Sequence, residues 1–152
     1  METTTQTTAS LYHRLGKYEG ITRITRSLIE NHMANPLVRI RYAGRDMTKV
    51  EKRVIEFFCA GAGGPETYTG QDMLTTHKAM NISEQEFVAV IDDAMAALES
   101  NGIDATTRND VLNILWSLKG EVIRVSIIQR SPCHCIGTSV PRALWWRIAT
   151  CP

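Results

Sequence analysis

Apolar residues recur at steps of three and four positions along most of this chain, which is the period of amphipathic helices. The clearest stretch begins after Ser83-Glu84-Gln85-Glu86, which has the spacing of a capping box, and it ends at Asn101-Gly102. Its apolar stripe consists of Phe87, Val90, Ile91, Ala94, Met95 and Leu98. The pattern predicts a helix between these two signals.

Three earlier stretches have the same period. A short helix follows Ser10, a suitable N-cap, and stops at Gly16. A second begins near Gly20 or Ile21 and ends at Asn35-Pro36, because the helical conformation is disfavoured for the residue before a proline. A third follows Asp46 or Thr48. The apolar stripes are Leu11, Tyr12 and Leu15 in the first helix, Ile21, Ile24, Leu28, Ile29 and Met33 in the second, and Met47, Val50, Val54, Phe57 and Phe58 in the third.

The two connections that flank the third helix differ in character. The first, residues 36–46, is apolar enough to predict an irregular segment packed against the body; its apolar residues are Val38, Ile40 and Tyr42. In the second, Gly61, Gly63, Gly64 and Pro65 forbid helix, so we expect a long shaped connection up to Gly70. About two turns of helix over residues 72–80 then carry a single histidine, His77.

A last helix opens near Asp104 and continues through Gly120, with Val111, Leu112, Leu115, Leu118 and Val122 as its inward stripe. The chain has no strand alternation strong enough to build a sheet, so the body is predicted to be all-α. We expect residues 1–9 to be a disordered arm, residues 10–129 to form one domain, and residues 130–152 to be a tail outside the core.

Composition narrows the class of protein. The chain has 152 residues, of which 22% are charged and 43% hydrophobic, with a formal net charge of +1, so a polyanion-binding surface for nucleic acid is not predicted. It has no apolar run of 18 residues, and its N-terminus does not resemble a signal peptide, so we expect a cytoplasmic protein that does not enter membranes. The four cysteines lack the even spread of a disulfide framework.

The tail holds two features that the body does not explain. Cys133-His134-Cys135 suggests soft-metal or redox chemistry, but it lacks a fourth ligand unless Cys151 or a second chain supplies one, and an unstructured extension is the plainer interpretation. Trp145-Trp146 suggests a short amphipathic segment for self-association or for a membrane surface.

Few kinds of chemistry suit the body. Cys59 lies in the Phe57-Phe58 run, where a small core residue is more common than a nucleophile, and the glycines lack the context of a phosphate loop. A haem needs one axial imidazole beside an apolar slot. The neighbours of His77 permit this chemistry: they are Met73, Met80, Ile82 and Phe87, with Phe57 and Phe58 as the facing wall. An ordinary surface or hydrogen-bonded histidine is the alternative.

An ordered set of markers resembles the truncated haemoglobins, most closely group I, over about residues 10–125. The markers are Leu15-Gly16, Asn35-Pro36, Gly44-Arg45-Asp46-Met47, Phe57-Phe58, Gly63-Gly64-Pro65, Tyr68-Thr69-Gly70, Asp72-Met73, His77, Ile82 and Phe87. The resemblance implies two helix pairs packed two over two around haem b, with His77 as the ligand to iron. It implies a set of haem contacts: Tyr42, Met47, Val50, Arg53, Val54, Phe57, Phe58, Met73, His77, Met80, Ile82 and Phe87.

On the distal side this chain departs from the family's pattern. The places where the family sets a tyrosine and a glutamine to hydrogen-bond oxygen hold Ile29 and Val54, and with Val50 they predict an apolar distal pocket. Tyr42 stands where the family has a phenylalanine, and it is the one obvious distal donor. Arg53 corresponds to a basic residue that often pairs with a haem propionate, or it is a solvated charge on the helix face.

The chemistry of these departures predicts weak oxygen stabilisation. A dioxygen ligand benefits from a hydrogen-bond donor, whereas carbon monoxide benefits little, so we expect faster oxygen loss than in relatives with the full polar pair. His32, three residues from Ile29, is expected on the helix surface, and an approach to the edge of the pocket is the alternative. Gly16-Lys17 replaces the family's paired glycines, which predicts an altered hinge there.

The resemblance implies a haem protein with a five-coordinate iron that binds oxygen, nitric oxide or carbon monoxide for sensing, storage, transport or scavenging. An enzyme remains the alternative, either a nitric oxide dioxygenase served by a reductase or a peroxidase-like catalyst, although no distal acid or base is apparent. A third possibility is a globin-shaped interaction protein without haem. We expect a monomer or a weak dimer.

Overall fold

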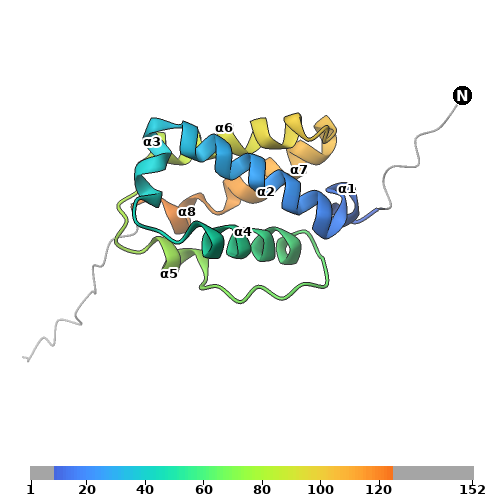
Figure 1. Ribbon diagram of the computed structural model, residues 1–152, viewed down its shortest axis with the longest axis horizontal. Helices are drawn as coiled ribbons and strands as arrows, with labels where there is room; N and C mark the ends of the chain where they lie inside the picture. The colour runs from blue at the N-terminus through green and yellow to red at the C-terminus, as the bar shows by residue number, and fades with distance from the viewer. Residues whose placement is uncertain (1–8, 125–152) are drawn as a thin grey trace, which may run out of the picture.

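The structure is a computed structural model that describes residues 9–124, and it is built of helices (Figure 1). The elements in chain order are α1 (Leu11–Arg14), α2 (Lys17–Ala34), α3 (Pro36–Arg39), the 3-10 turn η1 (Ile40–Tyr42), α4 (Met47–Gly61), α5 (Met73–His77), α6 (Glu84–Ser100), α7 (Ala105–Ser117) and α8 (Lys119–Val122). Within the described residues, the only strand-like pairing is a single parallel bridge between Ile82 and Ile123. The all-α prediction is confirmed.

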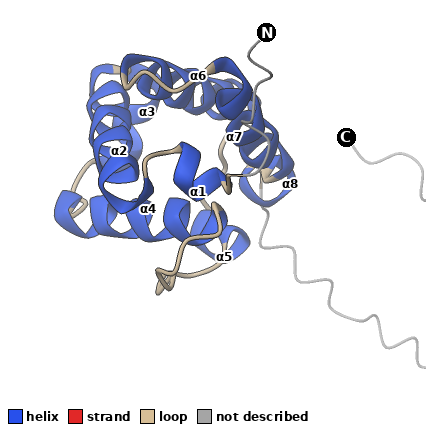
Figure 2. Ribbon diagram, turned by 90° about the vertical axis from the view of Figure 1, so that its right-hand side faces the viewer, coloured by secondary structure: helices blue, strands red, loops and turns tan. Residues whose placement is uncertain are grey.

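The long helices form two packed pairs. Helix α2 packs against α4, helix α6 packs against α7, and α2 also lies along α6, which joins the pairs. Figure 2 shows these helices around the centre of the fold, with α2 and α4 meeting at one corner and α6 and α7 at the opposite one. The short helix α5 lies beside α8, at one end of the molecule.

The buried apolar side chains form three clusters. The largest joins α1, α2, α4, α6 and α7; its buried members are Tyr12, Leu15, Ile21, Ile24, Ile55, Cys59, Ala62, Leu98 and Val111. A second lies around Ile82 and Phe87, and a third joins Leu28 to α6. Cys59 is fully buried, and burial raises the pKa of its thiol to about 11, which fits the predicted role of a small core residue.

The strongest capping signals were predicted correctly. The Ser83–Glu86 capping box is complete, and Asn101 and Gly102, the latter with a φ of 73°, end α6. Asp46 caps α4 by accepting from the backbone N–H of Thr48 at 3.1 Å. Helix α4 continues through Gly61, so that glycine lies inside the helix and not in the connection that follows.

Four predicted elements need correction. Helix α2 begins at Lys17, not near Ile21, after Gly16 and Lys17 turn the chain with φ of 81° and 57°. Residues 36–42 are short helical turns and not an irregular segment, because Asn35 caps α3 by accepting from the Leu37 N–H. Helix α5 is limited to residues 73–77. The last helix breaks at Leu118, before Gly120.

Several predictions concern residues that the structure does not describe. The arm of residues 1–8, the tail from residue 130, the Cys133-His134-Cys135 motif and the Trp145-Trp146 pair lie outside the described range. Between residues 9 and 124, no helix is both long and apolar enough to cross a membrane.

Candidate functional site

His77 lies at the end of α5, and its ring is held in one orientation. Asp72 caps this helix by accepting from the backbone N–H of Thr75 at 2.8 Å. The Nδ1 atom of His77 lies 2.8 Å from the carbonyl oxygen of Met73. Because a carbonyl can only accept, Nδ1 carries the proton and the lone pair is on Nε2. A half-buried imidazole with a free Nε2 fits the ligand that an iron requires.

The glycine-rich connection before α5 is fastened to the body at two points. The Tyr12 hydroxyl donates to Glu66 at 2.7 Å, and Glu56 on α4 accepts from the backbone N–H of Thr69 at 3.1 Å. Gly64 is required here, because a Cβ at this position would lie 2.6 Å from the Tyr12 ring and from the Glu66 carboxylate. The connection is therefore a shaped segment, as predicted, and these contacts set where α5 begins.

The segment after His77 joins the second apolar cluster. Ile82 and Phe87 are buried there, and Met80 packs against them half-buried. Arg41, at the middle of η1, donates from its guanidinium to the Met80 carbonyl at 2.9 Å and to Glu86 at 2.7 Å. Because Tyr42 is the next residue, Arg41 links the turn that carries Tyr42 to the segment that follows His77.

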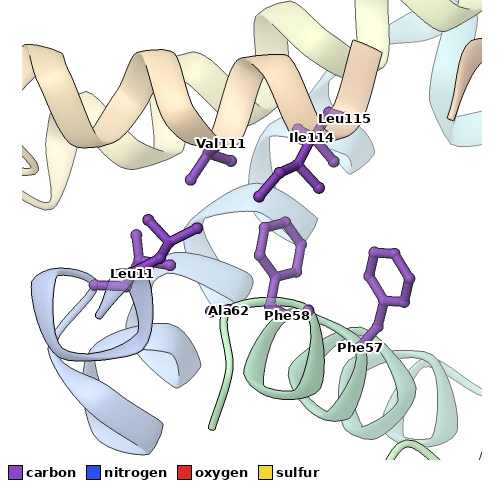
Figure 3. Close-up of a pocket in the computed structure, with 9 residues that line it drawn as sticks. Leu11, Phe57, Phe58, Ala62, Val111, Ile114 and Leu115 are labelled. Carbon is purple, nitrogen blue, oxygen red and sulfur yellow. The ribbon is translucent and has the colours of Figure 1, made fainter. Parts of the chain in front are cut away.

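The predicted apolar wall on α4 is less deeply buried than the residues at the centre of the core. Ile55 and Cys59 are buried in the main core, while the predicted contact residues are half-buried, and Phe58 among them also packs against that core. These half-buried residues are Met47, Val50, Val54, Phe57 and Phe58. Figure 3 shows Phe57 and Phe58 pointing toward α7 across a small apolar pocket. Half-buried apolar rings and methyl groups suit a flat apolar cofactor, so the residues present fit a haem.

The remaining predicted site residues lie on α2, α4 and α5. Ile29 is half-buried, and Val54 packs against the cluster around Leu28. Arg53 is exposed and donates to Glu56 at 3.0 Å, so its side chain is engaged along the helix. Met73 is half-buried on α5. The assignment of all these residues to haem stays a prediction.

His32 is the residue whose environment was predicted wrongly. It is 5% exposed and not on the helix surface, whereas Met33, predicted on the apolar stripe, is 44% exposed. Nδ1 of His32 lies 2.8 Å from Asp93 on α6, and its ring stacks on Tyr42 with 5.7 Å between ring centres. A signal was available, since His32 is four residues after the buried Leu28 and so continues its stripe.

Burial shifts two of these groups in the direction of their neutral forms. It lowers the pKa of His32, although the Asp93 carboxylate opposes this change. It raises the pKa of Tyr42, and the charge of Asp93 adds to that effect. At neutral pH, Tyr42 therefore keeps its phenolic proton and is a hydrogen-bond donor.

Comparisons with known proteins agree with this geometry. A family model described as bacterial-like globin matches residues 10–124. The group 1 truncated hemoglobin GlbN of Mycolicibacterium paratuberculosis is 27% identical over 114 residues, which cover 75% of this chain and 84% of the relative. The group 1 truncated hemoglobin of Tetrahymena pyriformis is 24% identical over 114 residues, which cover 75% of this chain and 94% of the relative.

Solved structures share the fold. The crystal structure of the truncated hemoglobin from Tetrahymena pyriformis in its Fe(III) form superposes with a TM-score of 0.74 at 22% identity, covering 76% of this chain and 99% of that one. The 2/2 hemoglobin from Synechococcus sp. PCC 7002, solved in the cyanomet state with covalently attached heme, superposes with a TM-score of 0.69 at 20% identity, covering 74% of this chain and 95% of that one.

Proposed function

The chain belongs to the bacterial-like globin family as a relative of the group 1 truncated haemoglobins, and from that premise we propose that it binds a diatomic gas at haem b held by His77. The two-over-two globin fold predicted from the sequence is confirmed. Haem-based gas binding is the general function of the family. The identity of the haem ligand residue, the open iron site and the apolar distal pocket are our proposals.

The observation that carries the proposal is the fixed imidazole of His77. Its Nδ1–H donates a hydrogen bond to the Met73 carbonyl, so Nε2 is the only ring nitrogen free to bind a metal. This hydrogen bond also increases the basicity of the imidazole, which strengthens it as a ligand. The haem, when bound, supplies an iron with an open coordination position for a gas.

The proposed distal residues support an apolar pocket that has few hydrogen-bond donors for the partial negative charge of bound oxygen. Ile29, Val50 and Val54 can offer only contact to a ligand, and none of them can donate a hydrogen bond. Tyr42 is the one donor among the predicted distal residues, and its phenol is protonated at neutral pH. We propose that its hydroxyl donates to oxygen and leaves carbon monoxide almost unaffected.

The test for the first part is spectroscopic. The ferrous full-length protein, loaded with haem, should give a Soret band that shifts on addition of carbon monoxide. His77→Ala should release haem more than about tenfold faster, since one ligand bond to iron is lost. His13→Ala is the matched control, because His13 is an exposed histidine on α1. A His77→Ala protein that retains haem and its wild-type spectrum would overturn the assignment.

The test for the second part is kinetic. Removing the Tyr42 hydroxyl by Tyr42→Phe forfeits one hydrogen bond of about 1 to 2 kcal/mol, which corresponds to roughly tenfold faster oxygen dissociation. Carbon monoxide dissociation should change little. Stopped-flow mixing measures both rates. An oxygen rate that does not change in Tyr42→Phe would show that the distal pocket has no donor in Tyr42.

A further inference from the structure

His32 and Asp93 form a fixed pair between two long helices. The His32 side chain is 6% exposed and that of Asp93 14% exposed. Both carboxylate oxygens of Asp93 also lie 3.2 Å from the Asn35 side-chain nitrogen, and the Asp93 backbone carbonyl accepts from Asn31 at 3.0 Å. Because Asn35 also holds the carboxylate, the imidazole that donates to it cannot rotate freely.

The hydrogen bond also sets the chemical state of the ring. An ionised carboxylate only accepts, so Nδ1 of His32 carries the proton. The flat imidazole is therefore fixed in plane and in tautomer before any neighbour is considered. An aliphatic residue at this position would fill the space, but it would not present one defined flat face.

Tyr42 rests on that face. The two rings are 20° from parallel, and Tyr42 reaches His32 from η1, a separate element. Among the residues that the structure describes, none forms a hydrogen bond with the Tyr42 hydroxyl. The position of this hydroxyl thus depends on ring packing alone, and the stacked imidazole is a rigid part of that packing.

We propose that Asp93 and His32 are positioning residues for Tyr42: Asp93 locks the imidazole, and the stacked imidazole fixes the plane of the phenol ring. This inference rests on the proposed function, because positioning Tyr42 matters only if its hydroxyl donates to the bound gas. The arrangement itself can be tested whether or not Tyr42 contacts the gas.

The first measurement follows the ring directly. In the diamagnetic carbon monoxide complex of the full-length protein, with tyrosine rings labelled, nuclear magnetic resonance reports how fast the Tyr42 ring flips. His32→Leu should make the flip several-fold faster than in wild type, while the separate variant Asp93→Asn, which can still accept from Nδ1, should keep most of the slow wild-type rate. Asn31→Ala is the matched control, because it removes a bond between the same helices without touching the imidazole.

The outcomes are distinct. An unchanged flip rate in His32→Leu, with a melt that shows the variant folded, would overturn the proposal, as would a change of equal size in Asn31→Ala. If His32→Leu does not fold, His32→Phe, which keeps a flat ring without the bond to Asp93, is measured in its place. It should give an intermediate rate, and a wild-type rate would overturn the role of Asp93.

A second measurement separates this proposal from the donor role of Tyr42. Oxygen dissociation should be several-fold faster in His32→Leu than in wild type, and His32→Leu should add nothing in a Tyr42→Phe background. An equal effect of His32→Leu in both backgrounds would show that His32 acts on the pocket by another route and would overturn the proposal. If oxygen dissociation is unchanged in Tyr42→Phe while the Tyr42 ring flips faster in His32→Leu, the donor role of Tyr42 fails and the positioning role of His32 stands.

Discussion

His77 lies on a helix of five residues whose other side chains are exposed or half-buried, whereas Tyr42 stacks on a histidine that is fixed between α2 and α6. The proposed proximal side of the site, around His77, is thus held by the glycine connection and by the Asp72 cap. The proposed distal side, around Tyr42, is held by buried side chains on long helices. Local stability differs across a protein, and weakly packed elements open first. We therefore expect the proximal segment, residues 73–82 around His77, to move more easily than the packing around His32 and Tyr42.

The largest effect should come from disturbing the proximal connection. Gly64→Ala places a Cβ 2.6 Å from the Tyr12 ring, so it should destabilise the fold by about 2 kcal/mol. Gly61→Ala is the control, because its Cβ meets no atom within 4 Å and the residue lies in α4. Thermal melts of both variants measure the difference. Equal melting temperatures would show that the close contacts of Gly64 do not hold the connection in place, which would contradict this part of the comparison.

The next effect is a pH dependence of the free energy of unfolding that comes from His32. Burial lowers the pKa of folded His32 below the 6.5 of the unfolded chain, so the unfolded state binds more protons just below that pH. Stability should consequently fall as the pH drops from about 6.5 toward the folded pKa, by at most about 1.4 kcal/mol per pH unit. Urea unfolding of the haem-free full-length chain over this range measures the slope.

Substitution assigns the slope to its residue. His32→Gln should remove this part of the acid dependence, and His13→Gln on the exposed face of α1 should leave it in place. A wild-type slope in His32→Gln would show that the buried pair is not the source.

The smallest effects should come from relieving backbone strain at two residues, one at the start of α2 and one just after His77. Lys17 at the start of α2 and Ala79 after His77 have φ of 57° and 66°, which cost a non-glycine residue about 1 kcal/mol. Lys17→Gly should recover most of that energy as a higher melting temperature. Ala79→Gly should recover less if the proximal segment opens before the core melts. Lys17→Ala should show no gain, because alanine has the same penalty. A larger rise in melting temperature for Ala79→Gly than for Lys17→Gly would contradict the expectation that the segment around His77 opens first.

The sequence was informative where one local signal determines the structure. The capping box at Ser83, the Asp46 cap and the glycines around Gly64 each act over a few residues, and each predicted its element. The assignment of His77 to iron came from the family resemblance, and it stays a prediction. The paired left-handed residues at Gly16 and Lys17 were harder, because lysine gives no sign that it adopts a positive φ.

The distal network could not be found by the same means. His32 and Asp93 are 61 residues apart, so no local pattern pairs them. A histidine within an apolar stripe was interpreted as a surface residue because its partner was unknown. The helical register after Leu28 indicated burial, but only the packing of α2 on α6 identifies the carboxylate that makes this burial tolerable.

Arg41 connects the segment after His77 to the turn that carries Tyr42. It is bonded to Met80, three residues past His77, and it precedes Tyr42 in the chain. A displacement of Tyr42 relative to the proximal segment must therefore stretch or break the bonds of one guanidinium. On the function proposed above, gas binding beside Tyr42 and movement of the His77 imidazole would be coupled to each other through the hydrogen bonds of Arg41.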